Sequence, residues 1–509
     1  MGMSNGTQPE APRPSFELFS NWLSLVGIAF LAVCFALGVV LAVADRLATE
    51  GIPYLGVAYV LIALIATSAG ALVLGGAFRT AWRRRRGRKV RGLRTISVDL
   101  GRPRDRVIAV ASLSGVVLVV VVTTFGAYET VAYVESDAFC GGACHSVMHP
   151  EALAHKLSPH ANVACVECHV GSGAGSFAES KLRGVRQLAH VISGSFARPI
   201  AVPIRSLRPA RETCEHCHWR ERWAGYKESM HTYFSREPDN KQTELRMLVK
   251  VGGARAGLMT GDGIHYHMMI GRTVEFAATD PNKQDIVWVR VREPDGRVKV
   301  FQRGDVKGEN GPPEGATLHH MDCLDCHNRP AHRFLAPMTA MNLYLAAGRI
   351  DPSLPSIKKK GVEVLSAEYP DSETAKRGIA KALREFYAKD QQLRKPEAIA
   401  MAVAAIQEIY ANNVFPEMKV RWSSYPDNLG HRDSPGCFRC HNDGLKDAAG
   451  QTVFTTCTKC HVVLTQSANN GEDRIDFAEG QTFFHSADEE HIHAYTDCSV
   501  CHTGGADTY

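Results

Sequence analysis

Six copies of a Cys-x-x-Cys-His motif recur along the chain and constrain its fold more than any other feature. The motif residues are Cys165, Cys168 and His169; Cys214, Cys217 and His218; Cys323, Cys326 and His327; Cys437, Cys440 and His441; Cys457, Cys460 and His461; and Cys498, Cys501 and His502. This spacing is the attachment signature of c-type haem, because two thiols bond one porphyrin and the histidine reaches its iron. A zinc ribbon or redox dithiol shares the cysteine pair, but six complete copies favour haem.

A seventh cysteine pair departs from this spacing. Cys140 and Cys144 are separated by three residues, and His145 and Met148 follow. Two of the intervening residues are glycines, which allow the extra residue to bulge without strain. We therefore expect a covalent haem here too, which gives seven haem c groups and uses 14 of the 15 cysteines. A disulfide or two free thiols is the alternative.

Three long uncharged stretches lie near the N-terminus, at residues 22–44, 54–78 and 107–128. Each is long enough to cross a bilayer core, which takes ~20 apolar residues. Residues 79–106, between the second and third stretches, carry twelve Lys or Arg and two Asp, a net charge of +10. Positive loops stay in the cytoplasm. We expect three transmembrane helices in a bacterial inner membrane, with the N-terminus cytoplasmic and the haem region periplasmic.

The positive charge of residues 79–106 is also compatible with nucleic-acid binding. A loop that keeps its side of the membrane cytoplasmic and contacts lipid headgroups accounts for the same charge, so we expect no nucleic-acid partner. Without this loop the chain is slightly acidic, since residues 107–509 have a net charge of −3. This charge weakly favours a soluble partner with a basic docking face.

The remaining chain predicts a multihaem cytochrome c domain that is mainly helical and irregular, with a small β insert. Alternating apolar residues around Asp295 and Gly296 predict a hairpin, and apolar residues at three- and four-residue steps predict helices within residues 328–420. The expected divisions are a cytoplasmic tail (1–20), three transmembrane helices (21–128) with the loop 79–106, haems 1–3 (129–225), a β-containing insert (226–322), haem 4 with a helical insert (323–422) and haems 5–7 (423–509).

Histidines outside the motifs are candidates for the second axial ligand, because low-spin electron-transfer haems use His/His or His/Met. Fifteen of the 22 histidines are available, too many for incidental surface residues. The candidates, several of them near a motif in sequence, are His160, His231, His265, His332, His431 and His485. Substitutes are His267, His319, His320, His491 and His493.

A membrane anchor followed by haem motifs, with a methionine just after the first (CHSVM), resembles the NapC/NirT/NrfH family of membrane-bound quinol dehydrogenases. The run SPHANVACVECHVGSGAGSFAESKLRGVRQLAHVISG resembles that family's second-haem and quinone-site segment. The chain also resembles the seven-haem inner-membrane cytochromes with which extracellular-respiring bacteria oxidise quinol from the membrane pool. Two later segments carry this resemblance, MDCLDCHNRPAHRF and NVFPEMKVRWSSYPDNLGHRDSPGCFRCHNDG.

The resemblance implies oxidation of menaquinol from the membrane quinone pool and electron transfer through the haems to periplasmic multihaem cytochromes. It implies that Met148 is a ligand of the first haem, where electrons enter, and that Lys181 contacts a quinol oxygen. The family has an aspartate one or two turns further on. Its nearest counterpart here is Gln187, one residue short in spacing, and His190 is a possible substitute.

Residues 177–192 predict an amphipathic helix. Its apolar residues Phe177, Leu182, Val185, Leu188 and Ile192 are expected on one face, with Lys181, Arg183, Arg186 and His190 towards the other. A helix lying on lipid headgroups, with no quinol site, is the alternative.

Other functions stay open at this point. A periplasmic terminal reductase for nitrite, hydroxylamine or a sulfur oxyanion would need an open haem far from the membrane, and no regular motif has lysine in place of its histidine, as in one nitrite reductase class. The reverse reaction, quinone reduction by an external donor, uses the same residues. Haem-based sensing would need a cytoplasmic output domain, whereas the expected cytoplasmic parts are one short tail and one basic loop.

Overall fold

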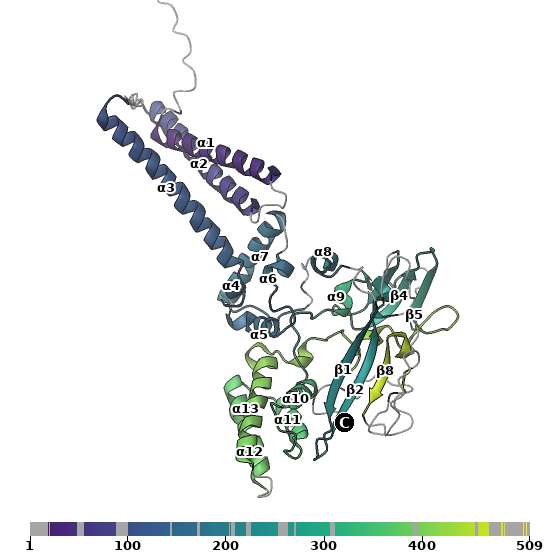
Figure 1. Cartoon of the computed structure of the whole chain (residues 1–509). Coiled ribbons are helices and arrows are strands. Elements are labelled where there is room, and N and C mark those ends of the chain that lie inside the picture. The colour runs from purple at the N-terminus through teal and green to yellow at the C-terminus, as the bar shows by residue number, and fades with distance from the viewer. Residues whose placement is uncertain are drawn as a thin grey trace, which may run out of the picture. The chain divides into compact units, whose positions relative to one another are not determined.

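The chain forms two compact units, which are described separately: residues 1–136 with 170–187, and residues 137–169 with 188–509. The computed structural model describes residues 19, 21–47, 55–87, 100–142, 145–170, 174–202, 204, 209–219, 225–252, 263–268, 271–305, 311–389, 395–453, 457–467, 480, 481, 483, 502 and 505. Figure 1 shows the helices and strands that these residues form.

Three long helices dominate the first unit, and each contains one of the three apolar stretches. They are α1 (Trp22–Leu47), α2 (Leu55–Arg85) and α3 (Pro103–Val134). Among the described residues, one segment is long and apolar enough to cross a membrane, Trp22–Val39 of α1, with a mean hydropathy of 2.4. A membrane-crossing α1 thus agrees with the sequence, and crossing by α2 and α3 stays a prediction.

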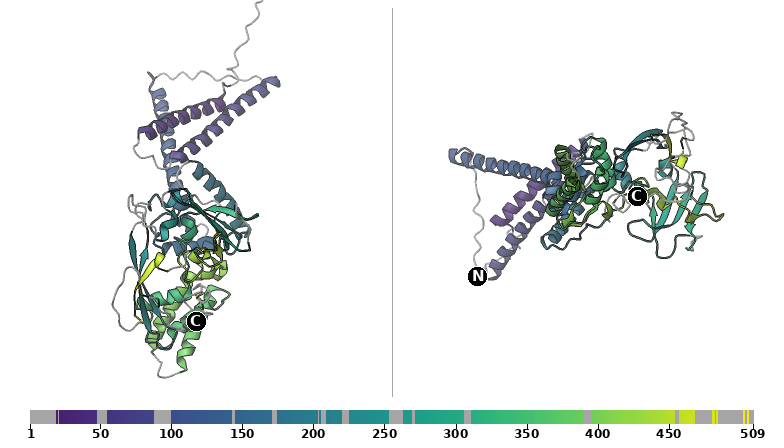
Figure 2. Two further views of the ribbon diagram at one scale, coloured as in Figure 1. Left: turned by 90° about the vertical axis from the view of Figure 1, so that its right-hand side faces the viewer. Right: turned by 90° about the horizontal axis from the view of Figure 1, so that it is seen from below.

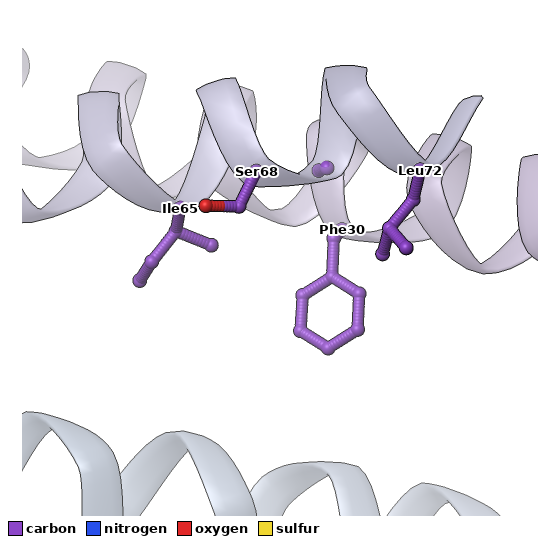
Figure 3. A pocket seen from close by; sticks show the side chains of 5 residues that line it. Phe30, Ile65, Ser68 and Leu72 are labelled. Atoms are coloured by element: carbon purple, nitrogen blue, oxygen red, sulfur yellow. The ribbon is translucent and has the colours of Figure 1, made fainter. Parts of the chain in front are cut away.

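Small residues let α1 and α2 pack closely. A Cβ atom on Gly27 would lie 2.6 Å from the Ala69 carbonyl oxygen, and Ser24 Oγ donates to the Val73 carbonyl at 3.0 Å. Close approach through small residues and interhelical hydrogen bonds is typical of helix pairs in lipid. Figure 3 shows a shallow pocket on this pair, where Phe30, Ile65 and Leu72 point to one side. Its lining is apolar apart from Ser68, so it offers no titratable group.

Single helical turns carry the haem motifs of the second unit. In three motifs the backbone N–H of the histidine donates to the backbone carbonyl of the first cysteine. These hydrogen bonds run from His218 to Cys214 at 2.7 Å, from His327 to Cys323 at 2.8 Å and from His441 to Cys437 at 3.0 Å. This bond closes one turn and brings both thiols and the histidine together. The segments at or beside the motifs are α4 (Asp137–Gly142), α5 (His145–Lys156), α6 (Cys165–His169), α8 (Ala210–Cys214), α9 (Cys323–Cys326), η7 (Gly436–Arg439) and η8 (Cys457–Lys459). Helix α7 (Ala174–Ile192) has residues in both units.

Two antiparallel sheets come mainly from the predicted β insert. The first has the order β1-β2-β8, from β1 (Tyr226–Phe234), β2 (Gln242–Lys250) and β8 (His461–Gln466). The second has the order β6-β3-β4-β5-β7, from β3 (Thr273–Ala278), β4 (Ile286–Arg292), β5 (Val298–Arg303), β6 (Thr317–His320) and β7 (Leu445–Lys446). The predicted hairpin is confirmed, since β4 pairs with β5 and Gly296 has a φ of +86° in the turn. Strands β7 and β8, from the C-terminal haem region, complete the two sheets.

Four helices form the predicted helical insert, green in Figures 1 and 2. They are α10 (Pro337–Ala346), α11 (Ile357–Ser366), α12 (Ser372–Ala388) and α13 (Pro396–Asn413). Helix α12 begins after Asp371, whose side chain accepts the Thr374 N–H at 2.7 Å. Its residues Ile379 and Leu383 are fully buried against α13. Three further 3-10 segments are η3 (Ile264–Met268), η5 (Pro416–Met418) and η6 (Trp422–Ser424).

Candidate functional site

Five motif histidines each lie beside a second imidazole ring. The ring centroids are 6.1 Å apart for His169 and His332, 6.0 Å for His218 and His160, 6.3 Å for His327 and His265, 5.7 Å for His441 and His267, and 6.2 Å for His461 and His431. Two imidazoles bound to opposite sides of one metal ion by ~2 Å bonds have centroids ~6 Å apart. The five pairs therefore have the spacing that an iron between them requires.

Hydrogen bonds orient four of the second imidazoles. Nδ1 of His160 donates to the Pro330 carbonyl at 3.2 Å, and Nδ1 of His265 to the Val251 carbonyl at 3.1 Å. Nδ1 of His267 donates to the Ile264 carbonyl at 3.2 Å, and Nδ1 of His332 to the Glu151 carbonyl at 3.0 Å. In each ring the lone pair then lies on Nε2, the arrangement usual for a metal-binding histidine.

Burial keeps these rings neutral. It lowers the pKa of His267 to about 4 and that of His332 to about 4, and it also lowers the pKa of His265. The motif histidines His327 and His461 have lowered pKa values for the same reason. A neutral imidazole is the form that binds a metal, so the donor set fits haem iron.

A charged pair supports His332. Glu151 Oε2 lies 3.3 Å from His332 Nδ1, and Arg329 Nη2 lies 3.3 Å from the same carboxylate oxygen. Burial raises the pKa of Glu151, which Arg329 opposes. His155, which the sequence did not single out, adds a third ring 6.2 Å from that of His332, and its Nε2 donates to the Val163 carbonyl at 2.9 Å. Carboxylate, guanidinium and backbone groups thus hold His332 against His169.

Thiols of neighbouring motifs also meet. The Cys165 side chain hydrogen-bonds with that of Cys140, and the Cys214 side chain with that of Cys323. The predicted first site is thus next to the second, and the third next to the fourth. Gly141 lies within α4, where a Cβ atom would come 3.0 Å from Ala152 Cβ. This glycine allows close packing against α5, and the expected bulge between Cys140 and Cys144 stays a prediction, because residues 143 and 144 lie outside the described residues.

Other predicted ligands have different surroundings. The recorded neighbours of the His231 ring among the described residues are Ser229 Oγ at 3.1 Å and Tyr233, stacked at 6.1 Å. His319 packs on Phe276 and His320 lies 3.5 Å from Glu275, both on the second sheet. Met148 is half-buried on α5, and His502 is also half-buried. The side chain of His145 and the residues Cys144, His485, His491, His493, Cys498 and Cys501 lie outside the described residues.

Helix α7 separates the three candidate quinol-site residues. At about 100° per residue, His190 lies on the opposite side of the helix from Lys181, and Gln187 lies about 120° away. Lys181 instead shares a side with Val185 and Leu188, which are exposed, so the expected placement of Lys181 on the polar face is wrong. His190 Nδ1 hydrogen-bonds Ser195 Oγ at 2.8 Å.

Glu135 is the recorded ion-pair partner of Lys181, and the sequence did not single it out. Lys181 Nζ lies 3.7 Å from Glu135 Oε1, where the glutamate side chain is 10% exposed and the lysine side chain 34%. Both residues belong to the first unit. The sequence places three carboxylates between the third apolar stretch and Cys140, at Glu129, Glu135 and Asp137, and it does not distinguish Glu135 from the other two.

Comparison with known proteins shows a clear similarity to a cytochrome. The chain is 36% identical over 501 residues to the cytochrome c-type protein ImcH of Geobacter sulfurreducens, and the match covers 96% of each chain. No family model matches the chain. No solved structure matches it.

Proposed function

The chain belongs to the family of cytochrome c-type proteins that includes ImcH, and from this premise we propose that it oxidises menaquinol at the bacterial inner membrane and passes the electrons to periplasmic cytochromes. A c-type cytochrome binds haem c covalently, and the bound irons accept and donate one electron at a time. The observation that carries the electron-transfer proposal is the set of five paired imidazoles. Each pair joins a motif histidine to a second buried or half-buried ring.

We propose the following axial pairs: His169 with His332, His218 with His160, His327 with His265, His441 with His267, and His461 with His431. The centroid distances and the Nδ1 hydrogen bonds support these assignments. Two strong-field nitrogen ligands favour fast outer-sphere electron transfer over substrate binding at the iron, because no axial position is open. This argues against a terminal reductase at these five sites.

Two more haems complete the proposed set of seven. His502 with Cys498 and Cys501 would hold the last one. Cys140 and Cys144 would hold the first, with His145 and Met148 as candidate ligands. The contact of Cys140 with Cys165 supports a first haem close to the second, as an electron-transfer chain requires.

Helix α7 is the proposed quinol-binding element. Its exposed Val185 and Leu188 offer an apolar surface for an isoprenoid tail, and Lys181 on the same side offers a hydrogen-bond donor to a quinol oxygen. An apolar surface with one convergent polar group suits an amphiphilic ligand. Lys181 contributes here as a positively charged donor that orients the quinol head group.

The test is anaerobic reduction of the oxidised, detergent-solubilised protein by a reduced menaquinone analogue, followed in the haem α-band. We expect rapid partial reduction that a quinone-site inhibitor blocks. Lys181→Ala should slow this reaction while leaving dithionite reduction unchanged, and Lys227→Ala, an exposed lysine on β1, should change neither. Full reduction by dithionite with none by the quinol would refute the proposal.

A further inference from the structure

A carboxylate lies beside the proposed quinol-binding lysine. We propose that Glu135 accepts the protons that the quinol releases, an inference that rests on the proposed function. Glu135 Oε1 is 3.7 Å from Lys181 Nζ, and its side chain is only 10% exposed. The two residues are 46 positions apart in the chain, so the contact joins the end of α3 to α7 within the first unit.

The reaction needs such a group. One quinol yields one quinone, two protons and two electrons, and the first haem, the proposed oxidant, takes the electrons singly. For each electron that leaves the quinol, one O–H bond breaks and its proton must pass to a base. The Glu135 carboxylate takes the first proton, becomes a neutral carboxylic acid, releases the proton to water and then takes the second. Lys181 holds the quinol oxygen.

Other candidate bases suit this role less well. Gln187 is an amide and accepts no proton. His190 lies on the side of α7 opposite Lys181 and is hydrogen-bonded to Ser195. Glu179 on the same helix is 69% exposed and is paired with Arg183 at 3.0 Å. Glu135 alone among these combines a carboxylate, contact with Lys181 and a largely buried side chain.

The chain itself ties Glu135 to the first haem site. Glu135 follows the last turn of α3, where its N–H donates to the Val131 carbonyl at 3.0 Å. It is five positions before Cys140 in the sequence, so the two Cα atoms are at most ~18 Å apart even in a fully extended chain. The proposed proton acceptor therefore stays near the point where electrons enter.

The test uses Glu135→Gln, Glu135→Asp and, as a matched control, Glu129→Gln, an exposed carboxylate on α3. Glu135→Gln should lower the rate of haem reduction by the quinol analogue ~100-fold, the usual contribution of a general base. It should leave dithionite reduction and the Kd of a hydroxyquinoline N-oxide inhibitor unchanged. Glu135→Asp, which keeps the carboxylate on a shorter side chain, should lower the rate less than Glu135→Gln does, while Glu129→Gln behaves as wild type.

Two results would overturn the inference while the proposed function stands: a quinol-driven rate in Glu135→Gln equal to that of the wild type, or a loss of rate accompanied by an equal loss of inhibitor binding. In the second case Glu135 shapes the site and takes no proton. A wild-type protein that the quinol does not reduce would refute the proposed function itself, which separates the two failures. If Glu135→Gln fails to assemble its haems, the quinol-driven rate of Glu135→Asp decides, because the shorter side chain moves the carboxylate away from Lys181 and should lower the rate while inhibitor binding is unchanged.

Discussion

The rings of His265 and His327 lie nearly parallel, with centroids 6.3 Å and planes 17° apart. The two residues come from separate parts of the chain: His265 from η3 in the β-containing insert, and His327 from the turn after α9. His265 is fixed by its Nδ1 hydrogen bond to Val251, at the end of β2. The insert therefore supplies a candidate iron ligand, and the same 3-10 segment supplies His267 for the next site. This insert contributes two candidate haem ligands as well as strands of the two sheets.

Removing one candidate iron ligand by mutation tests this role of η3. His267→Ala should convert one haem from low to high spin, because it removes the ring beside His441. The change is measured by EPR or magnetic circular dichroism of the oxidised protein. His319→Ala is the matched control, since that ring packs on Phe276, and it should leave the wild-type spectrum unchanged. A high-spin signal from His319→Ala, with none from His267→Ala, would refute the assignment.

Glu151 should set the potential of one haem. Its carboxylate touches His332 and is only partly offset by Arg329. Removing the negative charge with Glu151→Gln should destabilise the oxidised iron by roughly 1 kcal/mol, or roughly 40 mV for one electron. We expect a spectroelectrochemical titration to show one haem with a raised midpoint potential. Glu363→Gln, an exposed change on α11, should leave the titration curve unchanged; an identical curve for Glu151→Gln would exclude the role.

The haem motifs could be predicted from the sequence because their two cysteines and their histidine lie within five consecutive residues. The pairs of imidazole rings could not, because the two histidines of a pair can lie far apart in the sequence. His332 follows His327 by five residues, yet its ring lies beside His169, and His431 lies beside His461 rather than His441. The reason is that each pair joins segments far apart in the sequence, so the residues around a motif do not specify which distant histidine lies beside it. Glu135 was missed for a related reason. Its partner Lys181 is 46 residues away, and nothing in the local pattern of α3 marks the contact.

Close packing of α1 on α2 predicts that a larger side chain at Gly27 destabilises the first unit. Gly27→Leu should push the helices apart, because even its Cβ atom would lie 2.6 Å from the Ala69 carbonyl oxygen. Gly38→Leu is the control on the same helix, since a Cβ there has no described neighbour within 4 Å. We expect Gly27→Leu to lower thermal stability in detergent by ~2 kcal/mol, the cost of overpacking. Equal melting temperatures for the two variants would show that the close packing of α1 on α2 at Gly27 does not contribute to stability.

Lys358 makes the stability of the helical insert depend on pH. Its side chain is fully buried on α11, and Nζ donates to the Met338 carbonyl at 2.9 Å and to Asn342 Oδ1. Burial, helped by Arg432 and Arg236, lowers the pKa of Lys358 to about 7. The unfolded chain, with an ordinary lysine pKa near ~10.4, then binds the proton more tightly than the folded chain. The free energy of unfolding should therefore rise with pH from about 7 to about 10, by at most ~1.4 kcal/mol per pH unit.

Lys358→Met should abolish this rise, because methionine fills the same space without a charge to titrate. Thermal unfolding followed by far-UV circular dichroism at pH 7 and pH 9 measures the slope. Wild type should be more stable at pH 9 by ~2 kcal/mol, and Lys358→Met should be equally stable at both. Lys381→Met is the matched control, because that lysine is 75% exposed on α12 and should keep the wild-type slope. If Lys358→Met keeps it too, another group titrates in this range and Lys358 stays charged when buried.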